Sequence, residues 1–174
     1  KNDLNKKRYK KSDLKFLIND KNSFSGIINY LNNKSNGKIE NEINVTASSV
    51  YSESHDPFNA VKFNNSSYFQ SGDSYGSWIC FDFKEYRVMP THCKIKSINS
   101  NANDYHPKAW EIYGSDDKNN WETLWSGFYD SYLNGYEAVH MYDINNQQSK
   151  KFRFIKMQIT STNWNDTNIL AINS

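Results

Sequence analysis

The fold predicted for this chain of 174 residues rests on one stretch, Lys108-Ala109-Trp110-Glu111-Ile112-Tyr113-Gly114-Ser115-Asp116-Asp117. Alternation of apolar and polar residues predicts a strand here that places Trp110 and Ile112 on one face. Gly114 can adopt positive φ, and the Ser and Asp residues after it can hydrogen-bond their own backbone, so a turn is expected. A second strand then follows from Trp121. Two indoles beside one turn give a sheet a large apolar area to bury.

Short alternating runs, separated by clusters of Asn, Ser, Gly and Asp, continue the β pattern through the rest of the chain after Gly37. Such regular spacing is typical of an antiparallel β-sandwich or jelly roll. We therefore expect a mainly β domain over residues 38–174, in which Trp78, Trp110 and Trp121 are largely buried. The expected strands are residues 43–47, 77–83, 92–98, 108–113, 121–125, 136–143 and 151–160.

The N-terminal part of the chain has a different character. Residues 1–11 contain six Lys or Arg residues and one Asp, so, of a net charge of +2, the remainder carries −3. The domain body is therefore not expected to bind nucleic acid, and the basic tail is interpreted as a solvated linker. Within residues 12–37, apolar positions at helical spacing predict one broken or two short amphipathic helices, ended by Asn36-Gly37. Packing on the sandwich is favoured for this extension over docking of a partner.

The Trp–Gly-Ser-Asp-Asp–Trp pattern resembles the discoidin domain, also called the coagulation-factor type C domain. The resemblance runs from about Ile43 to Ile172 and includes residues 45–49, 57–61, 77–83 and 152–156. More narrowly, Asp82-Phe83-Lys84, Pro90-Thr91-His92 and Asn163-Trp164-Asn165 resemble the intracellular branch found beside BTB-type domains. The resemblance implies a galactose-binding-like sandwich that serves as a binding scaffold.

Motifs for catalysis or cofactor binding do not stand out in this sequence. The four His residues are scattered, and there is no Cys-x-x-Cys, Gly-x-Ser-x-Gly or phosphate-binding glycine loop. We therefore expect a non-catalytic module without a cofactor. The resemblance also bears on calcium. Several sugar-binding discoidin relatives hold a structural calcium, and in that pattern Asp follows Ala-Val. Here Lys62 follows Ala60-Val61, and an ammonium group opposes a bound cation, so no metal is expected.

The cysteines and the apolar pattern bear on the compartment. Extracellular discoidin domains usually join their ends by a disulfide, whereas Cys80 and Cys93 are internal. We expect both to be free thiols in a reducing environment. No apolar run approaches about 18 residues, so no transmembrane segment is expected. No apolar leader is visible either, and an intracellular setting is favoured over an extracellular one.

The residues that bind a ligand are expected in loops. By resemblance, segments 48–58, 64–76, 99–107 and 161–168 cluster at one end of the sandwich. Aromatic faces stack on sugar rings or peptide side chains, while amides and imidazoles orient a ligand. We expect a protein partner, bound in an adaptor role; carbohydrate binding at a cell surface and a structural role in a cytoskeletal assembly are the alternatives. Local packing is the alternative for each candidate residue. The candidates are Tyr51, His55, Tyr75, Tyr105, His106, Asn163, Trp164 and Asn165.

Overall fold

The computed structural model describes residues 24–62 and 66–174; the basic tail and the first predicted helical piece lie outside them. The helical elements are α1 (Ile27–Lys34), η1 (Ile39–Asn41), η2 (Glu53–His55) and η3 (Pro57–Val61). The strands are β1 (Asn44–Ala47), β2 (Phe69–Gln70), β3 (Trp78–Asp82), β4 (His92–Lys96), β5 (Trp110–Ser115), β6 (Glu122–Gly127), β7 (Val139–Asp143), β8 (Phe154–Ile159) and β9 (Ala171–Ile172).

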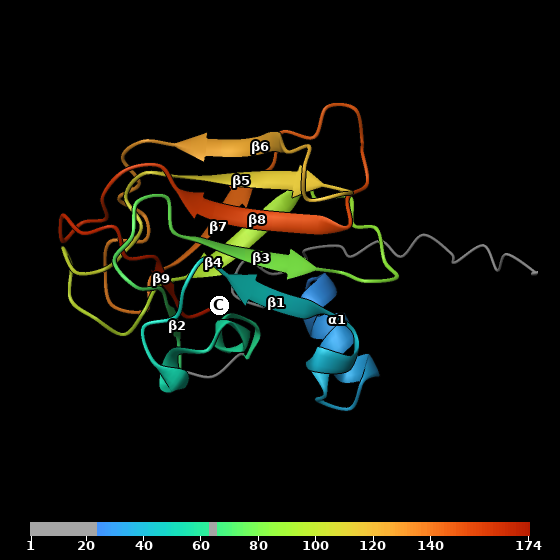
Figure 1. Ribbon diagram of the computed structural model, residues 1–174, viewed down its shortest axis with the longest axis horizontal. Coiled ribbons are helices and arrows are strands. Elements are labelled where there is room, and N and C mark those ends of the chain that lie inside the picture. The colour runs from blue at the N-terminus through green and yellow to red at the C-terminus, as the bar shows by residue number, and fades with distance from the viewer. Residues whose placement is uncertain (1–23, 63–65) are drawn as a thin grey trace, which may run out of the picture.

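The strands form an antiparallel β-sandwich, as predicted. Five of them make one sheet in the order β1-β3-β8-β5-β6, and β4 pairs with β7 behind it (Figure 1). Each expected strand is present, although most are shorter at one or both ends. The pair β2-β9 was not anticipated, because two residues per strand are too few to show alternation. β9 closes the domain near the C-terminus.

The core lies between the five-stranded sheet and the β4-β7 sheet. Register places Ile79, Met157 and Ile112 side by side on β3, β8 and β5, facing inward. Trp110 is fully buried, and its ring lies 4.0 Å from that of Trp125. Burial of such large apolar side chains is the main favourable term in folding.

The prediction that Trp78, Trp110 and Trp121 are largely buried is fully met by Trp110, and neither of the other two is solvent-exposed. Trp78 and Trp121 are half-buried, because they lie on the outer face of the five-stranded sheet. Lys156 lies 4.5 Å from the Trp121 ring and covers part of that face.

The turn after β5 forms as expected, but Gly114 has a different role in it. Gly114 belongs to β5 without positive φ, and a Cβ there would lie 2.7 Å from the Phe152 ring. The left-handed residue is instead Lys118, with φ of 63°. Ser115 Oγ accepts the N–H groups of Asp117 and Lys118 at 3.2 and 3.0 Å, which stabilises the turn.

Helix α1 packs on the sandwich, as favoured from the sequence. Leu31 is fully buried in the core, and Ile27 and Ile28 pack against it. The helix ends at Lys34, and the predicted stop follows it, because Gly37 has φ of 82° and donates its N–H to the Asn32 carbonyl at 2.8 Å. Within the described chain, α1 and the other helices are too short and too polar to cross a bilayer.

Both cysteines are free thiols, as predicted. Cys80 lies on β3 and Cys93 on β4, in different sheets. Burial raises the pKa of Cys80 to about 11 and that of Cys93 to about 12.

Candidate functional site

The loops predicted to gather at one end of the sandwich do so, toward the left of Figure 1. The Tyr51 N–H donates to the Gln70 carbonyl at 2.9 Å, and the Trp164 N–H donates to the His106 carbonyl at 3.1 Å. Segments far apart in the sequence are thereby joined into one surface. We call this surface the loop end; its described residues are 48–58, 66–76, 99–107 and 161–168.

Tyr51, His55 and Tyr68 form a group of rings at this end, which we call the Tyr51 cluster. The His55 ring lies 5.4 Å from Tyr51 and 4.8 Å from Tyr68, edge to face in both cases. Its Nδ1 lies 2.8 Å from Ser52 Oγ and 3.1 Å from Ser54 Oγ, so two hydroxyls fix the imidazole. Nε2 makes no hydrogen bond to any described residue. Tyr51 is 63% exposed, which leaves its ring open to a ligand.

Tyr105 joins the Tyr51 cluster from another loop. Tyr105 and Tyr68 pack against the same small apolar cluster beneath the loops. Burial, followed by the nearby charge of Asp104, raises the pKa of Tyr68. Asp104 also accepts the Tyr105 N–H at 3.0 Å, so a carboxylate lies beside the rings. Three predicted residues are thus brought together, and Tyr68, which sequence reasoning missed, lies between them.

His106 and Asn163 occupy buried positions below the loop end. His106 Nε2 lies 2.9 Å from the Asn101 carbonyl. Asn163 donates to the Ile169 carbonyl at 2.9 Å and accepts the Thr167 N–H at 3.1 Å. Both side chains are sealed from solvent and hold the loop backbone, so contact with a ligand would require these loops to open.

Trp164 belongs to a second group, which we call the Trp164 platform. Its Nε1 donates to the Asp130 carbonyl at 2.9 Å, and its ring lies 4.7 Å from the exposed ring of Tyr129. Lys108 Nζ lies 5.6 Å from the indole and 3.3 Å from Asp166 Oδ1. The indole is thus fixed in place but still half-exposed.

Tyr75 and Asn165 stand apart from both groups. Tyr75 is 83% exposed and makes no ring contact with any described residue. The Asn165 side chain is exposed, while its N–H donates to Asn163 Oδ1 at 2.9 Å. Their predicted role in ligand contact therefore rests on exposure alone.

A further aromatic surface lies on the connection between β6 and β7, residues 128–138, and was not anticipated. Fully buried Leu133 anchors this segment in the core. Asp130 accepts hydrogen bonds from Trp110 Nε1 and from the Tyr132 N–H, each at 2.9 Å. The signal in the sequence was the density of aromatic residues between two strands. The exposed aromatic residues are Phe128, Tyr129, Tyr132 and Tyr136.

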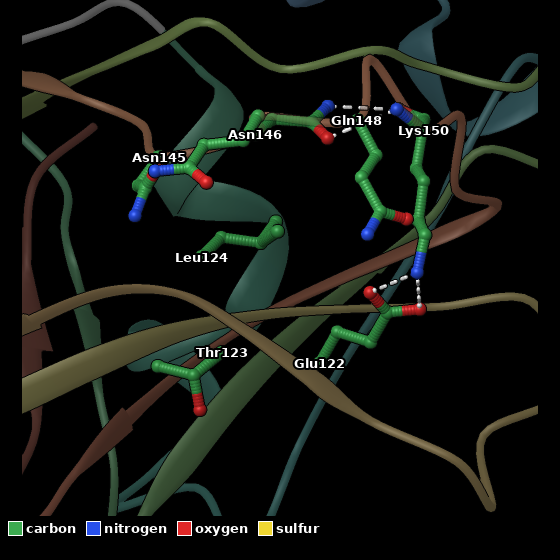
Figure 2. A pocket seen from close by; sticks show the side chains of 8 residues that line it. Glu122, Thr123, Leu124, Asn145, Asn146, Gln148 and Lys150 are labelled. Atoms are coloured by element: carbon green, nitrogen blue, oxygen red, sulfur yellow. Dashed lines mark hydrogen bonds and ion pairs between the residues drawn. The ribbon is translucent and has the colours of Figure 1, made fainter.

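A polar hollow of about 150 Å³ lies at the end opposite the loops, between β6 and the segment before β8. Figure 2 shows that its polar side chains bind one another or the neighbouring main chain. Lys150 Nζ lies 2.7 Å from Glu122 Oε2, and Asn146 Nδ2 donates to the Lys150 carbonyl at 2.8 Å. Because its charges are already paired, this hollow offers a ligand little to bind.

The described residues do not provide a metal site. Across residues 24–62 and 66–174, no three His, Cys, Asp or Glu side chains converge as ligands. Lys62, which led to the expectation of no calcium, is exposed directly after η3. The absence of bound metal stays a prediction.

Solved structures similar to this chain include carbohydrate-binding modules. CpGH89CBM32-5 from Clostridium perfringens, in complex with GalNAc-β-1,3-galactose, has 13% identity and a TM-score of 0.61, with 77% of this chain and 93% of that chain covered. The CBM32 of AlyQ, in complex with 4,5-unsaturated mannuronic acid, has 18% identity and a TM-score of 0.58, with 75% and 89% covered. Chitosan-binding module 1 of a chitosanase/glucanase from Paenibacillus sp. IK-5 has 13% identity and a TM-score of 0.57, with 75% and 90% covered.

These structural matches concern the fold, because their identities are low. A comparison with curated protein sequences gave no match. The resemblance to the intracellular branch beside BTB-type domains is not addressed by these matches and stays a prediction. The F5/8 type C domain family matches residues 44–172, which is most of the described β-sandwich. The chain therefore belongs to the F5/8 type C, or discoidin, domain family.

Proposed function

We propose that this domain binds carbohydrate without catalysis, through the Tyr51 cluster at its loop end. The observation that carries the proposal is the exposed Tyr51 ring, which lies beside the His55 imidazole. Ser52 fixes this imidazole through Nδ1, and its Nε2 makes no hydrogen bond to any described residue. A sugar presents C–H groups that stack on an aromatic face and hydroxyls that need hydrogen-bond partners at its rim. The Tyr51 cluster offers both.

The chemistry of the cluster favours a neutral sugar. Its polar groups are hydroxyls, an imidazole and the Asp104 carboxylate, and it contains no Lys or Arg. A carboxylate accepts hydrogen bonds from sugar hydroxyls but repels an anionic ligand. Similar structures in complex with GalNAc-β-1,3-galactose or with galactose support the same class of ligand.

The test compares two tyrosines of nearly equal exposure. Tyr51 is 63% exposed and Tyr136, outside the cluster, is 66% exposed. We expect the 174-residue chain to bind galactose-, N-acetylgalactosamine- or N-acetylglucosamine-containing oligosaccharides in isothermal titration calorimetry. Y51A should weaken that binding about tenfold or more, whereas Y136A should change it less than about twofold. The proposal is wrong if no such oligosaccharide binds at millimolar concentration, or if both variants lose binding equally.

A protein partner is the second candidate, and the connection between β6 and β7 favours it. Exposed aromatic side chains on a segment anchored by Leu133 are the type of residue that dominates protein interfaces. An intracellular adaptor would use this surface. Replacing Tyr132 and Tyr136 with Ser should then remove a partner isolated from the native cell, while Y51A should retain it.

A further inference from the structure

The outer face of the five-stranded sheet holds a groove of about 290 Å³ that is separate from the loop end. Strand register aligns Thr46, Cys80 and Lys156 across β1, β3 and β8. The turn between β5 and β6 brings Lys118 and Trp121 to the same place. The groove is lined by Thr46, Trp78, Cys80, Lys118, Trp121 and Lys156.

Two ammonium groups in this groove are held by aromatic rings. Lys156 Nζ lies 4.5 Å from the centroid of the Trp121 ring and 4.7 Å from that of Tyr113. Lys118 Nζ lies 4.8 Å from the Phe154 ring. Burial lowers the pKa of Lys156, because its charge is incompletely solvated there. Among the described residues, neither lysine forms an ion pair.

Two carboxylates that lie close to residues of the groove are already engaged. Asp82 binds Arg153 through two contacts of 2.7 and 3.0 Å. Glu111 accepts hydrogen bonds from the hydroxyl groups of Tyr113 and Ser126. The groove itself is lined by no acidic residue, so it is locally positive on a domain body whose net charge is negative.

We propose that this groove binds a carboxylate-bearing sugar ring of an acidic polysaccharide. Lys118 and Lys156 would pair with the carboxylate, and the half-buried indoles of Trp78 and Trp121 would contact the ring. A bound carboxylate would give each ammonium the ion pair that it lacks among the described residues. The ring contact distinguishes a uronate from an acidic peptide, which has charge but no sugar face.

The groove also differs from the loop end in the sign of its charge. The Tyr51 cluster has a carboxylate and no cation, whereas the groove has two cations and no carboxylate. The two surfaces are therefore expected to hold different sugars. Their binding can be measured separately on one protein.

The experiment uses hexagalacturonate as the probe and the whole chain labelled with fluorotryptophan. Calorimetry gives the affinity, and the NMR resonances of Trp78 and Trp121 report contact in the groove. We expect K118Q/K156Q to weaken binding about tenfold or more, because two charge-assisted contacts are lost. K150Q is the matched control, since Lys150 is exposed and paired with Glu122; it should change affinity less than about twofold. Thermal melting verifies that each variant is folded.

Five results would overturn the proposal, and the last of them concerns Y51A. The other four concern the groove itself. They are no binding of hexagalacturonate, full binding by K118Q/K156Q, equal loss in K150Q, and equally tight binding of poly-glutamate with the same shifts of Trp78 and Trp121. Y51A should retain hexagalacturonate binding. If Y51A removes it instead, the uronate binds at the loop end, which overturns the groove proposal and leaves the loop end as a sugar site.

Discussion

The loop end and the outer face of the sheet carry similar side chains but position them differently. At the loop end, exposed rings depend on buried polar residues below them, such as Asn163 and His106. On the outer face, Lys156 and Cys80 are positioned directly by strand register. A loop needs such anchors because its backbone groups are not satisfied by neighbouring strands.

Because of this difference, substitutions at the two surfaces should affect stability and binding differently. A substitution that removes an anchor of the loop end should destabilise the domain and disturb its ligand surface together. A substitution on the outer face should alter the groove and leave the strand hydrogen bonds intact. The predictions below test this contrast, starting with the anchor.

The largest effect is expected from Asn163→Ala. The Asn163 side chain is fully buried and forms hydrogen bonds to Thr167, Ile169 and the Asn165 N–H. Its loss leaves buried donors and acceptors unpaired, so the free energy of unfolding should fall by about 3 kcal/mol. Urea denaturation monitored by tryptophan fluorescence measures this change.

Asn165→Ala is the matched control for that prediction. Asn165 is two residues away, and its side chain is exposed. Its replacement should change stability by less than about 0.5 kcal/mol. Equal losses in the two variants would show that the buried amide is not the anchor, and the contrast between the two surfaces would fail.

The sandwich was predictable because burial of one sheet face imposes alternation. The run containing Trp110 and Ile112 shows this alternation, whereas the run around Ile79 is continuously apolar, which also favours a buried strand. The strands β2 and β9 have two residues each, which is too short for a pattern. The sequence predicted that Gly114 is needed for positive φ, but the structure shows that it is needed for the close approach of Phe152. Both requirements favour glycine, so the sequence does not distinguish them.

The loop end was predictable only as a region. A polar residue in a loop can face a ligand or hold the backbone, and both roles require the same donors and acceptors. Asn163 and Asn165 therefore look alike in the sequence, yet one is buried and the other exposed. The groove could not be predicted, because Thr46 and Lys156 are distant in the sequence and only register places them on either side of Cys80.

A smaller effect is expected at Cys80, which lies within the groove and is almost fully buried. Iodoacetamide reacts with the thiolate, and burial raises the pKa of Cys80 to about 11 and that of Cys93 to about 12. For Cys80, this rise leaves very little thiolate near neutral pH.

Intact mass measurement can follow this reaction. We expect negligible modification of the native protein over the time in which the denatured protein, without reductant, gains two adducts. Rapid modification of Cys80 in the native protein would show that its thiol is more exposed to solvent than the structure indicates. A denatured chain with no reactive thiol would instead indicate a disulfide.

The smallest effect, a null result, is expected from calcium. A ligand held only by the native state raises the melting temperature by mass action. Calcium binds preferentially to several anionic oxygens, whereas Lys62 places an ammonium group after Ala60-Val61. Millimolar calcium should therefore leave the melting temperature unchanged, as measured by differential scanning fluorimetry against a magnesium control.

Lys62→Asp supplies the missing carboxylate and tests whether this position decides the outcome. A calcium-dependent rise in the unsubstituted chain, especially with sugar binding lost in EDTA, would show that a metal helps to anchor the loop end.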